Sequence, residues 1–482
     1  MSDHPGEIPP PGVWAVAARL LLVAVGTALF SLFPLSLTAS SYVQAGDRAL
    51  EAGDFDAAIA AYHAAATAAP GDARPLDRAA RAEAAAGRFD EAERDLRRLA
   101  AMAGWTAERY RRLGEALSAR GETQAAVTAW QAALEIDPED AGALRALAGA
   151  YVQAKDWAQA VAALERLTTV DPGDAAARYR LGLLAAAYDP ETAVQHLSMA
   201  SANPAFTGAA TEVMRQLDAL AGEPDRAFAD AQLAVTLMAL EEWAMAEHAL
   251  SQALLLNPAY AEARAYLGLV RDRQGQDGLP DLLEAVELAP ENALTRYALG
   301  SHYVRAGDYD AAIPLLIQAA SLEPNNPAIV AELAAAYRGR GDLEDAERWL
   351  RRAAELDREN VFFWEQLAAF YADTGYRLKE GGLTAIHTAA QRAPDSADVH
   401  ASLGWALYQA GDGEAARREI EQALALDPRN PRALYYHGVL REVAGDEAGA
   451  IDAYRGVLTV APGSELAALA ERGLGRLASR DE

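Results

Sequence analysis

A repeat of 34 residues is the feature that most limits what this chain can fold into. Pro394, Pro428 and Pro462 follow one another at this spacing, and it also separates Pro138 from Pro172. A period in this range is typical of stacked supersecondary units, because a single unit cannot bury its apolar face alone. The repeat therefore predicts a solenoid rather than one compact core.

Each period consists of two short helical segments joined by a turn of the Gly-Asp type. Examples of the turn with the second segment are EAGDFDAAIAAY (51–62) and RAGDYDAAIPLL (305–316). Glycine permits the left-handed conformation that ends a helix, and proline cannot extend the second segment. Hydrophobic residues make up 51% of the chain but aromatic residues only 7%, so alanine, a strong helix former, is abundant. We expect an all-α solenoid of about twelve helix pairs.

Two copies show the recurring positions clearly. In the copy that ends at Pro138 they are Tyr110, Leu113, Gly114, Leu117, Gly121, Ala126, Trp130 and Ala133. In the copy that ends at Pro324 they are Leu299, Gly300, Tyr303, Gly307, Ala312, Leu316 and Ala319. On these residues the chain resembles the tetratricopeptide repeat family, over roughly residues 42–462. The resemblance implies a right-handed superhelix in which the first helix of each pair lines a concave face.

Departures from the period divide the chain. The distance from Pro204 to Pro258 is 54 residues, which is one period plus 20. We interpret the surplus as an extra helix, and we expect a last helix to cover the apolar face of the final repeat. The predicted order is a polar tail (1–12), an apolar segment (13–39), a block of about five repeats (40–206), an extra helix with a linker (207–224), a block of about seven repeats (225–462) and a C-terminal capping helix (463–482).

The apolar segment at 13–39 is predicted to be a transmembrane anchor. Residues 20–37 carry no charge, and as a helix they would span about 27 Å, close to the hydrocarbon thickness of a bilayer. The alternative is a secretory signal peptide. With an anchor, Arg19 on its amino side favours a cytoplasmic N-terminus and an extracytoplasmic repeat array. Because a charge inside a membrane usually has a partner, Arg19 is also a candidate contact with another membrane subunit.

The charge balance limits the partners. The chain has 43 basic and 70 acidic residues, a net charge of −27, which repels nucleic acid. Two interpretations stay open: a solvated surface that repels itself, and a groove that attracts basic partners. No cysteine is present, so disulfides and thiolate chemistry are excluded.

The motifs of catalysis are missing from the sequence. None of the eight histidines is spaced from another as an i, i+4 metal pair, and no phosphate-binding loop, dinucleotide fingerprint or nucleophile elbow occurs. We therefore expect no enzyme, no metal, no cofactor and no small-molecule substrate.

A cluster of aromatic residues near the C-terminus is the candidate binding site. Trp405 and Tyr408 lie beside the packing positions Leu403, Gly404 and Leu407 of their copy, so the repeat does not require them. Comparable places in the flanking copies hold Arg432, Tyr435, Tyr436 and Phe362. Aromatic residues with an arginine are typical of protein–protein hot spots. The alternative is that the rings pack between neighbouring first helices or beneath the final helix.

These observations predict a membrane-tethered scaffold. It would bind peptide segments or protein surfaces on the concave face of the array and so recruit or assemble a complex. Its partners would be other proteins, membrane-complex subunits among them, and the membrane itself through residues 13–39. The alternative is an integral accessory or structural subunit of a larger membrane complex, whose anchor helix makes specific contacts. A third possibility, a helper in envelope export or assembly, rests on analogy alone.

Overall fold

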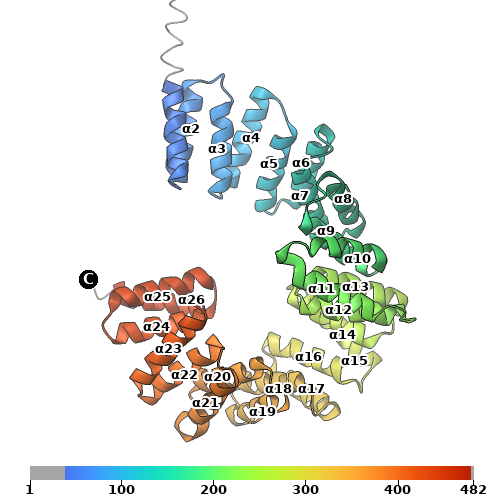
Figure 1. Cartoon of the computed structure of the whole chain (residues 1–482), viewed down its shortest axis with the longest axis vertical. Coiled ribbons are helices and arrows are strands. Elements are labelled where there is room, and N and C mark those ends of the chain that lie inside the picture. Colours follow the sequence, from blue (N-terminus) through green and yellow to red (C-terminus); the bar gives the residue numbers. More distant parts are fainter. Residues whose placement is uncertain (1–37, 479–482) are drawn as a thin grey trace, which may run out of the picture. The chain divides into compact units, whose positions relative to one another are not determined.

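The structure of the chain, a computed structural model, describes residues 38–478, which contain helices and no strand. Two compact units divide it, one that ends at Gly222 and one that begins at Glu223. Figure 1 shows both units as successions of short helices. The predicted all-α class is therefore confirmed for the described residues.

The helix bounds follow the repeat. In the first unit they are residues 38–51, α2 (Phe55–Ala68), α3 (Arg74–Ala85), α4 (Phe89–Ala103), α5 (Ala107–Ala119), α6 (Thr123–Ile136), α7 (Ala141–Gln153), α8 (Trp157–Val170), α9 (Ala175–Ala186), α10 (Pro190–Ala200) and α11 (Pro204–Ala219). In the second they are α12 (Arg226–Ala239), α13 (Trp243–Leu256), α14 (Ala261–Arg273), α15 (Leu279–Leu288), α16 (Ala293–Ala306), α17 (Tyr309–Leu322), α18 (Pro327–Arg340), α19 (Leu343–Leu356), α20 (Val361–Thr374), the π-helical turn η1 (Leu378–Gly382), α21 (Leu383–Arg392), α22 (Ala397–Ala410), α23 (Gly413–Leu426), α24 (Pro431–Val443), α25 (Glu447–Val460) and α26 (Glu465–Ala478).

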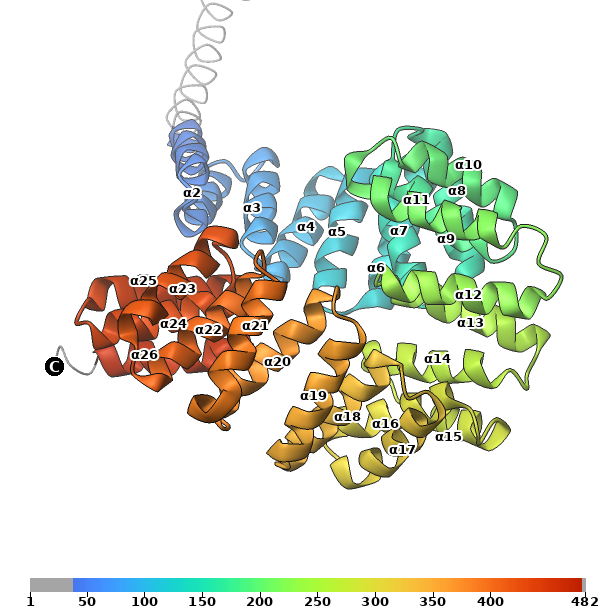
Figure 2. The same ribbon diagram turned by 60° about the horizontal axis from the view of Figure 1, so that its bottom comes forward.

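Neighbouring helices form antiparallel pairs, which Figure 2 shows from a second side. The strongest packing joins the two helices of one repeat, such as α5 with α6, α18 with α19 and α22 with α23. Two helices stand outside this pairing. In the first unit α11 packs on α9 and α10, and in the second α26 packs on α24 and α25. The predicted repeat counts and the right-handed twist stay predictions.

The Gly-Asp turn ends one helix and begins the next. Gly411 closes α22 with a φ of 99°, a left-handed conformation that costs glycine little. Asp412 then caps α23, because its side chain accepts a hydrogen bond from the backbone N–H of Ala415 at 3.0 Å. Where the sequence has Lys155 in place of the glycine, the backbone still adopts a φ of 57°. The turn geometry is thus kept even without glycine.

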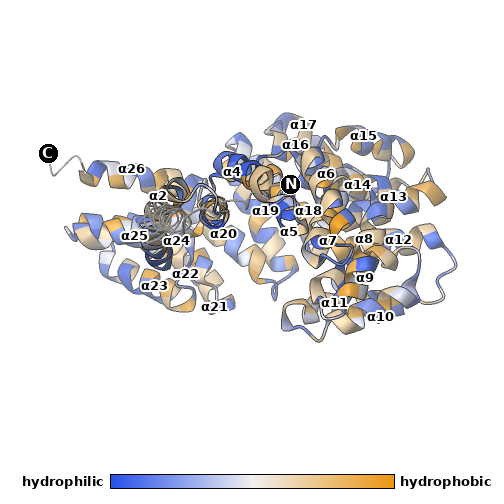
Figure 3. Cartoon of the chain, turned by 90° about the horizontal axis from the view of Figure 1, so that it is seen from above, coloured by the Kyte–Doolittle hydropathy of each residue, from blue (hydrophilic) through white to orange (hydrophobic). Residues whose placement is uncertain are grey.

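Close helix crossings explain the glycine inside several of the first helices. A Cβ atom on Gly404 would come within 2.6 Å of the Ile420 side chain, and one on Gly438 within 2.7 Å of the Tyr454 ring. The two helices of a pair therefore meet with a large side chain lying directly on glycine backbone. Hydrophobic and hydrophilic residues both occur along the helices (Figure 3), as expected when one side of each helix is packed.

Within the second unit the first helices of successive pairs also contact one another. These contacts join α14 with α16, α16 with α18, α20 with α22, and α22 with α24. Successive second helices pack less closely. The side formed by α14, α16, α18, α20, α22 and α24 is called the first-helix face below, and it is the side on which the sequence predicts a binding surface.

The predicted membrane anchor lies almost wholly outside the described residues. This applies to residues 13–37, Arg19 included. Between residues 38 and 478, no helix has both the length and the apolar character that a membrane span requires. The anchor and its orientation stay predictions.

Candidate functional site

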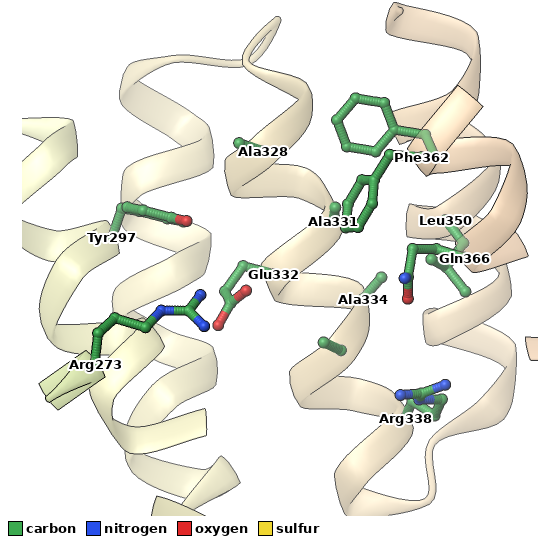
Figure 4. A pocket seen from close by; sticks show the side chains of 12 residues that line it. Arg273, Tyr297, Ala328, Ala331, Glu332, Ala334, Arg338, Leu350, Phe362 and Gln366 are labelled. Atoms are coloured by element: carbon green, nitrogen blue, oxygen red, sulfur yellow. The ribbon is translucent and has the colours of Figure 1, made fainter. Parts of the chain in front are cut away.

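A hollow of about 380 Å³ opens on the first-helix face of the second unit (Figure 4). It lies among α14, α16, α18 and α20, and one residue of α19 closes its floor. We call it the α18 hollow. Its lining residues are Arg273, Tyr297, Ala328, Ala331, Glu332, Ala334, Ala335, Arg338, Leu350, Phe362, Phe363 and Gln366.

Small side chains on α18 create the hollow. Ala328, Ala331 and Ala335 line it from this helix, while Tyr297 and Phe362 project from α16 and α20 on its two sides (Figure 4). Phe362 is 50% exposed although it is a large apolar residue. Burial raises the pKa of Tyr297 to about 12, so its hydroxyl stays neutral and able to donate a hydrogen bond. Apolar walls with a few polar groups are typical of ligand pockets.

Charged groups stand at the sides of the hollow. Glu332 accepts a hydrogen bond from the Ser301 hydroxyl at 2.8 Å, and burial raises the pKa of its carboxyl group. The Arg273 side chain points toward Glu332, whereas Arg338 lies near Gln366 (Figure 4). Both arginines are exposed, and within residues 38–478 neither forms a salt bridge. Arg338 is therefore available to a carboxylate of a partner, while Arg273 already faces the carboxyl group of Glu332.

The predicted aromatic residues form a stack between two neighbouring first helices. The ring of Trp405 on α22 lies 4.6 Å from that of Tyr436 on α24, with an angle of 2° between the planes. Tyr408 stacks on Trp405 at 5.2 Å. Tyr436 is buried, while Trp405 and Tyr408 keep part of their surface exposed. These rings do pack between first helices, and the role of their exposed surface in partner binding stays a prediction.

Arg432 ties this aromatic stack to a third first helix. Its Nη1 donates to Oδ1 of Asp373 on α20 at 2.7 Å and approaches the Tyr436 hydroxyl at 3.4 Å. A second bond in the same region runs from Nε2 of Gln409 to the carbonyl oxygen of Ala372 at 2.7 Å. Three successive first helices, α20, α22 and α24, are thus joined by polar contacts as well as by rings.

Two predicted residues lie outside the stack itself, Tyr435 and Phe362. Tyr435 adjoins the stack, with its ring 5.8 Å from that of Tyr436, and its ring also lies 6.0 Å from that of Tyr454 in the cluster that contains Leu477 of α26. Phe362 belongs to the α18 hollow. The aromatic set that the sequence suggests is therefore divided between two places on the second unit, the α18 hollow and the stack with its neighbour Tyr435.

The sequence did not identify the charged residues that line the α18 hollow. Arg273, Glu332 and Arg338 come from two different repeats and are not marked by any motif. The available signal is the run of small residues on α18, AELAAAY at 331–337, flanked by repeats with Tyr297 and Phe362 at the face. Such a local loss of side-chain volume on a binding face predicts a hollow.

Each unit repeats an antiparallel helix pair, and several of these pairs cross at a glycine. This arrangement defines a helix-pair solenoid. Two models of the tetratricopeptide repeat match the chain, one at residues 117–187 and 303–369 and the other at 78–141 and 401–465. The chain belongs to the tetratricopeptide repeat family, as its sequence pattern predicts. Its repeats indicate a scaffold for protein–protein interaction.

Solved structures are similar to the chain at low sequence identity. Yeast Tom70 is 15% identical, with 92% of this chain and 97% of that chain covered and a TM-score of 0.41. The APC/C heterotetramer Cut9–Hcn1 gives 13% identity, 93% and 99% coverage and a TM-score of 0.39. A tetratricopeptide repeat protein from Parabacteroides merdae gives 14% identity, 52% and 98% coverage and a TM-score of 0.42. No curated protein matches the sequence.

Proposed function

We propose that the chain is a membrane-tethered, non-catalytic scaffold that binds an extended segment of a partner protein on the first-helix face of its second unit, and thereby recruits the partner into a complex. The α18 hollow carries this proposal. It is a concave, partly apolar site on the face that the family fold presents to partners, and Phe362 is exposed at its side. The uncharged run at residues 20–37 supports the tether.

The chemistry of the hollow suggests the chemistry of the bound segment. An apolar side chain fits over Ala331 and Ala335 between the rings of Tyr297 and Phe362. A carboxylate next to that residue would pair with the exposed Arg338. The chain as a whole carries a net charge of −27, so an acidic segment gains nothing from long-range attraction and depends on these local contacts. We therefore propose a partner segment with an apolar side chain close to a carboxylate.

The exposed surfaces of Trp405 and Tyr408 offer a second contact for the same partner. They lie on the same face of the same unit, on α22, beyond α20. Aromatic rings held rigid by stacking lose little conformational entropy when a partner covers them. We propose that they bind a surface of the partner next to the segment held in the hollow.

Photo-crosslinking tests the binding site. A photoreactive phenylalanine analogue replaces Phe362 in the full chain, expressed in its native membranes, and crosslinked proteins are identified by mass spectrometry. The matched control carries the same probe at Leu322 on the second helix α17, which is 45% exposed against 50% for Phe362. We expect a crosslinked partner protein only from the probe at position 362. Ala331→Leu in the same chain should abolish that crosslink. Equal crosslinks from both positions would contradict the proposal.

Membrane fractionation tests the tether separately. The full chain should stay with the membrane after a carbonate wash, and a chain lacking residues 1–37 should be released. Protease protection in sealed vesicles then tests the proposed extracytoplasmic array. If Arg19→Leu leaves the chain in the membrane but removes it from a larger complex, the integral accessory subunit is the better description.

A further inference from the structure

Three ligand-type side chains from three helices meet in the first unit. His63 lies on α2, Glu83 on α3 and Asp95 on α4. Nε2 of His63 is 3.1 Å from Oε1 of Glu83 and 2.7 Å from Oδ2 of Asp95. One ligand atom from each residue lies within 4.8 Å of the other two. The sequence does not suggest this cluster, because His63 and Asp95 are 32 residues apart and belong to different repeats.

Glu83 is the unusual member of the cluster. Its side chain is 0% exposed, and neither carboxylate oxygen accepts a hydrogen bond. In several other repeats the same place, four residues before the turn, holds an apolar core residue, as with Leu117, Tyr337 and Leu407. A carboxylate therefore occupies a packing position, where burial without a partner is costly.

The other buried carboxylates of the described chain all have an arginine within salt-bridge distance. Glu93 pairs with Arg97 and Arg120, Asp230 with Arg226, Glu247 with Arg271, and Asp281 with Arg264 and Arg271. No arginine forms such a bridge with Glu83 in residues 38–478. The charged groups that act on its carboxyl group are Asp95, His63, Glu91 and Arg94. Among residues 38–478, every buried carboxylate except that of Glu83 thus has a guanidinium within salt-bridge distance.

His63 alone cannot neutralise both carboxylates. His63 turns one nitrogen, Nε2, toward both carboxylates, and that nitrogen carries at most one proton. With both carboxyl groups ionised, even a protonated imidazole would leave a net negative charge among the three groups. A divalent cation supplies the missing charge and accepts a lone pair from each ligand at once.

We propose that His63, Glu83 and Asp95 bind one divalent metal ion, with Zn²⁺ as the best match. One imidazole nitrogen and two carboxylate oxygens are a ligand set that zinc accepts, at about 2.0–2.2 Å from each atom. The imidazole nitrogen lies 3.1 and 2.7 Å from the two carboxylate oxygens, so side-chain shifts would bring the three atoms to these distances from one ion. Because the ligands come from α2, α3 and α4, the ion joins the first two helix pairs of the array. Three protein ligands leave a coordination position open, and His63, with 42% of its side chain exposed, provides access from solvent.

Zinc titration of the full chain, after treatment with a chelator, tests the site. Isothermal titration calorimetry with ZnCl₂ should give one tight site per chain, and the midpoint of thermal unfolding should rise with added zinc. Removal of a direct ligand should weaken binding by more than about 100-fold, because loss of outer partners alone costs about 10- to 100-fold. The variants are His63→Asn and Glu83→Gln. His400→Asn is the matched control, since His400 also faces a carboxylate, Glu419, but no second one is bound to it.

Glu83→Gln keeps the shape of the side chain and removes only the buried charge. It should therefore fold at least as well as the wild type without zinc, while it loses the zinc response. This separates loss of the site from loss of the fold. Zinc binding that is equal in wild type, His63→Asn and Glu83→Gln would overturn the proposal. So would a wild type without zinc response, because Glu83, whose pKa burial raises to about 7, would then be neutralised by a proton instead.

Discussion

Two regions of the first-helix face, around α18 and around α22 and α24, share one backbone plan and differ in side-chain volume. At α18 the face is built of alanines, and a hollow of about 380 Å³ is left among four helices. At α22 and α24, Trp405, Tyr408 and Tyr436 fill the corresponding space with stacked rings. The same repeat thus gives a pocket in one place and a packed aromatic surface in another.

The difference shows which contacts the repeat needs. A small residue of the first helix lies at the crossing in both regions: Gly300 of α16 lies under Leu316 and Gly404 of α22 under Ile420, and α18 has the buried Ala334 at the same position. These contacts hold each pair together whatever the residues on the face. The residues on the first-helix face are therefore free to vary. Their side-chain volume decides whether a partner inserts a side chain into a hollow or lies against aromatic rings.

The largest effect is expected from Tyr436→Ala in the aromatic stack. This ring is 5% exposed and stacks on Trp405, so its loss leaves a cavity between α22 and α24 and should destabilise this region by about 3 kcal/mol. Urea unfolding, followed by hydrogen exchange of the two helices, measures the effect. Tyr408→Ala is the control and should cost less because Tyr408 is partly exposed. Equal losses for both would show that the stack does not hold α22 to α24.

A pair of alanine-to-leucine changes tests the contrast in volume directly. Ala406 of α22 is 0% exposed, so Ala406→Leu should overpack the helix crossing and cost about 2 kcal/mol. Ala331→Leu adds the same atoms in the α18 hollow and should change stability by less than about 0.5 kcal/mol. Both variants are compared by their urea midpoints. If Ala331→Leu were the more costly change, the hollow would have no room for a partner side chain.

The fold could be predicted from the sequence because its determinants are local and repeated. Glycine and aspartate mark the turn within most repeats and proline marks the end of the second helix, so one unclear copy such as the one with Lys155 does not obscure the pattern. The face was harder to predict. Trp405 is recognisable as a residue beside the packing positions, but its stack with Tyr436 depends on how adjacent repeats meet.

The hollow and the His63 cluster could not be predicted for a physical reason. Both arise where residues of different repeats converge, and the crossing geometry of the helices decides which of them meet. Arg273 and Arg338 approach the same cavity from α14 and α18, with no spacing that marks them. Glu83 gave a local signal, a carboxylate at an apolar position, but its partners become visible only in three dimensions.

A smaller effect on stability is expected from removing the ion pair that joins the aromatic region to α20. Arg432 and Asp373 join α24 to α20 at 2.7 Å, with side chains 24% and 40% exposed. Partly exposed pairs contribute about 0.5–1 kcal/mol, so a double-mutant cycle of Arg432→Gln and Asp373→Asn should give a coupling energy in this range. The coupling should shrink in 1 M NaCl. A salt-independent coupling would point to the contact of Arg432 with Tyr436 instead.

The smallest effect on stability is expected from replacing the carboxyl group of Glu332 in the α18 hollow. Burial raises the pKa of Glu332 above its usual 4.5, although the Ser301 hydroxyl and the charges of Arg305 and Arg273 oppose the shift. A raised pKa means that folding favours the protonated form. Its contribution to stability is therefore full below pH 4.5 and is lost as the pH rises through the raised value.

Glu332→Gln should accordingly flatten the stability profile above pH 4.5 and make the chain slightly more stable than the wild type near pH 8. Glu355→Gln, which makes the same charge change at an exposed place on α19, is the control. Urea midpoints at a series of pH values measure both. Because Glu332 lies on α18 and Ser301 on α16, the difference in hydrogen exchange between wild type and Glu332→Gln should be localised to these two helices. A response spread over α22 and α24 would mean that the two regions of the face are coupled rather than independent.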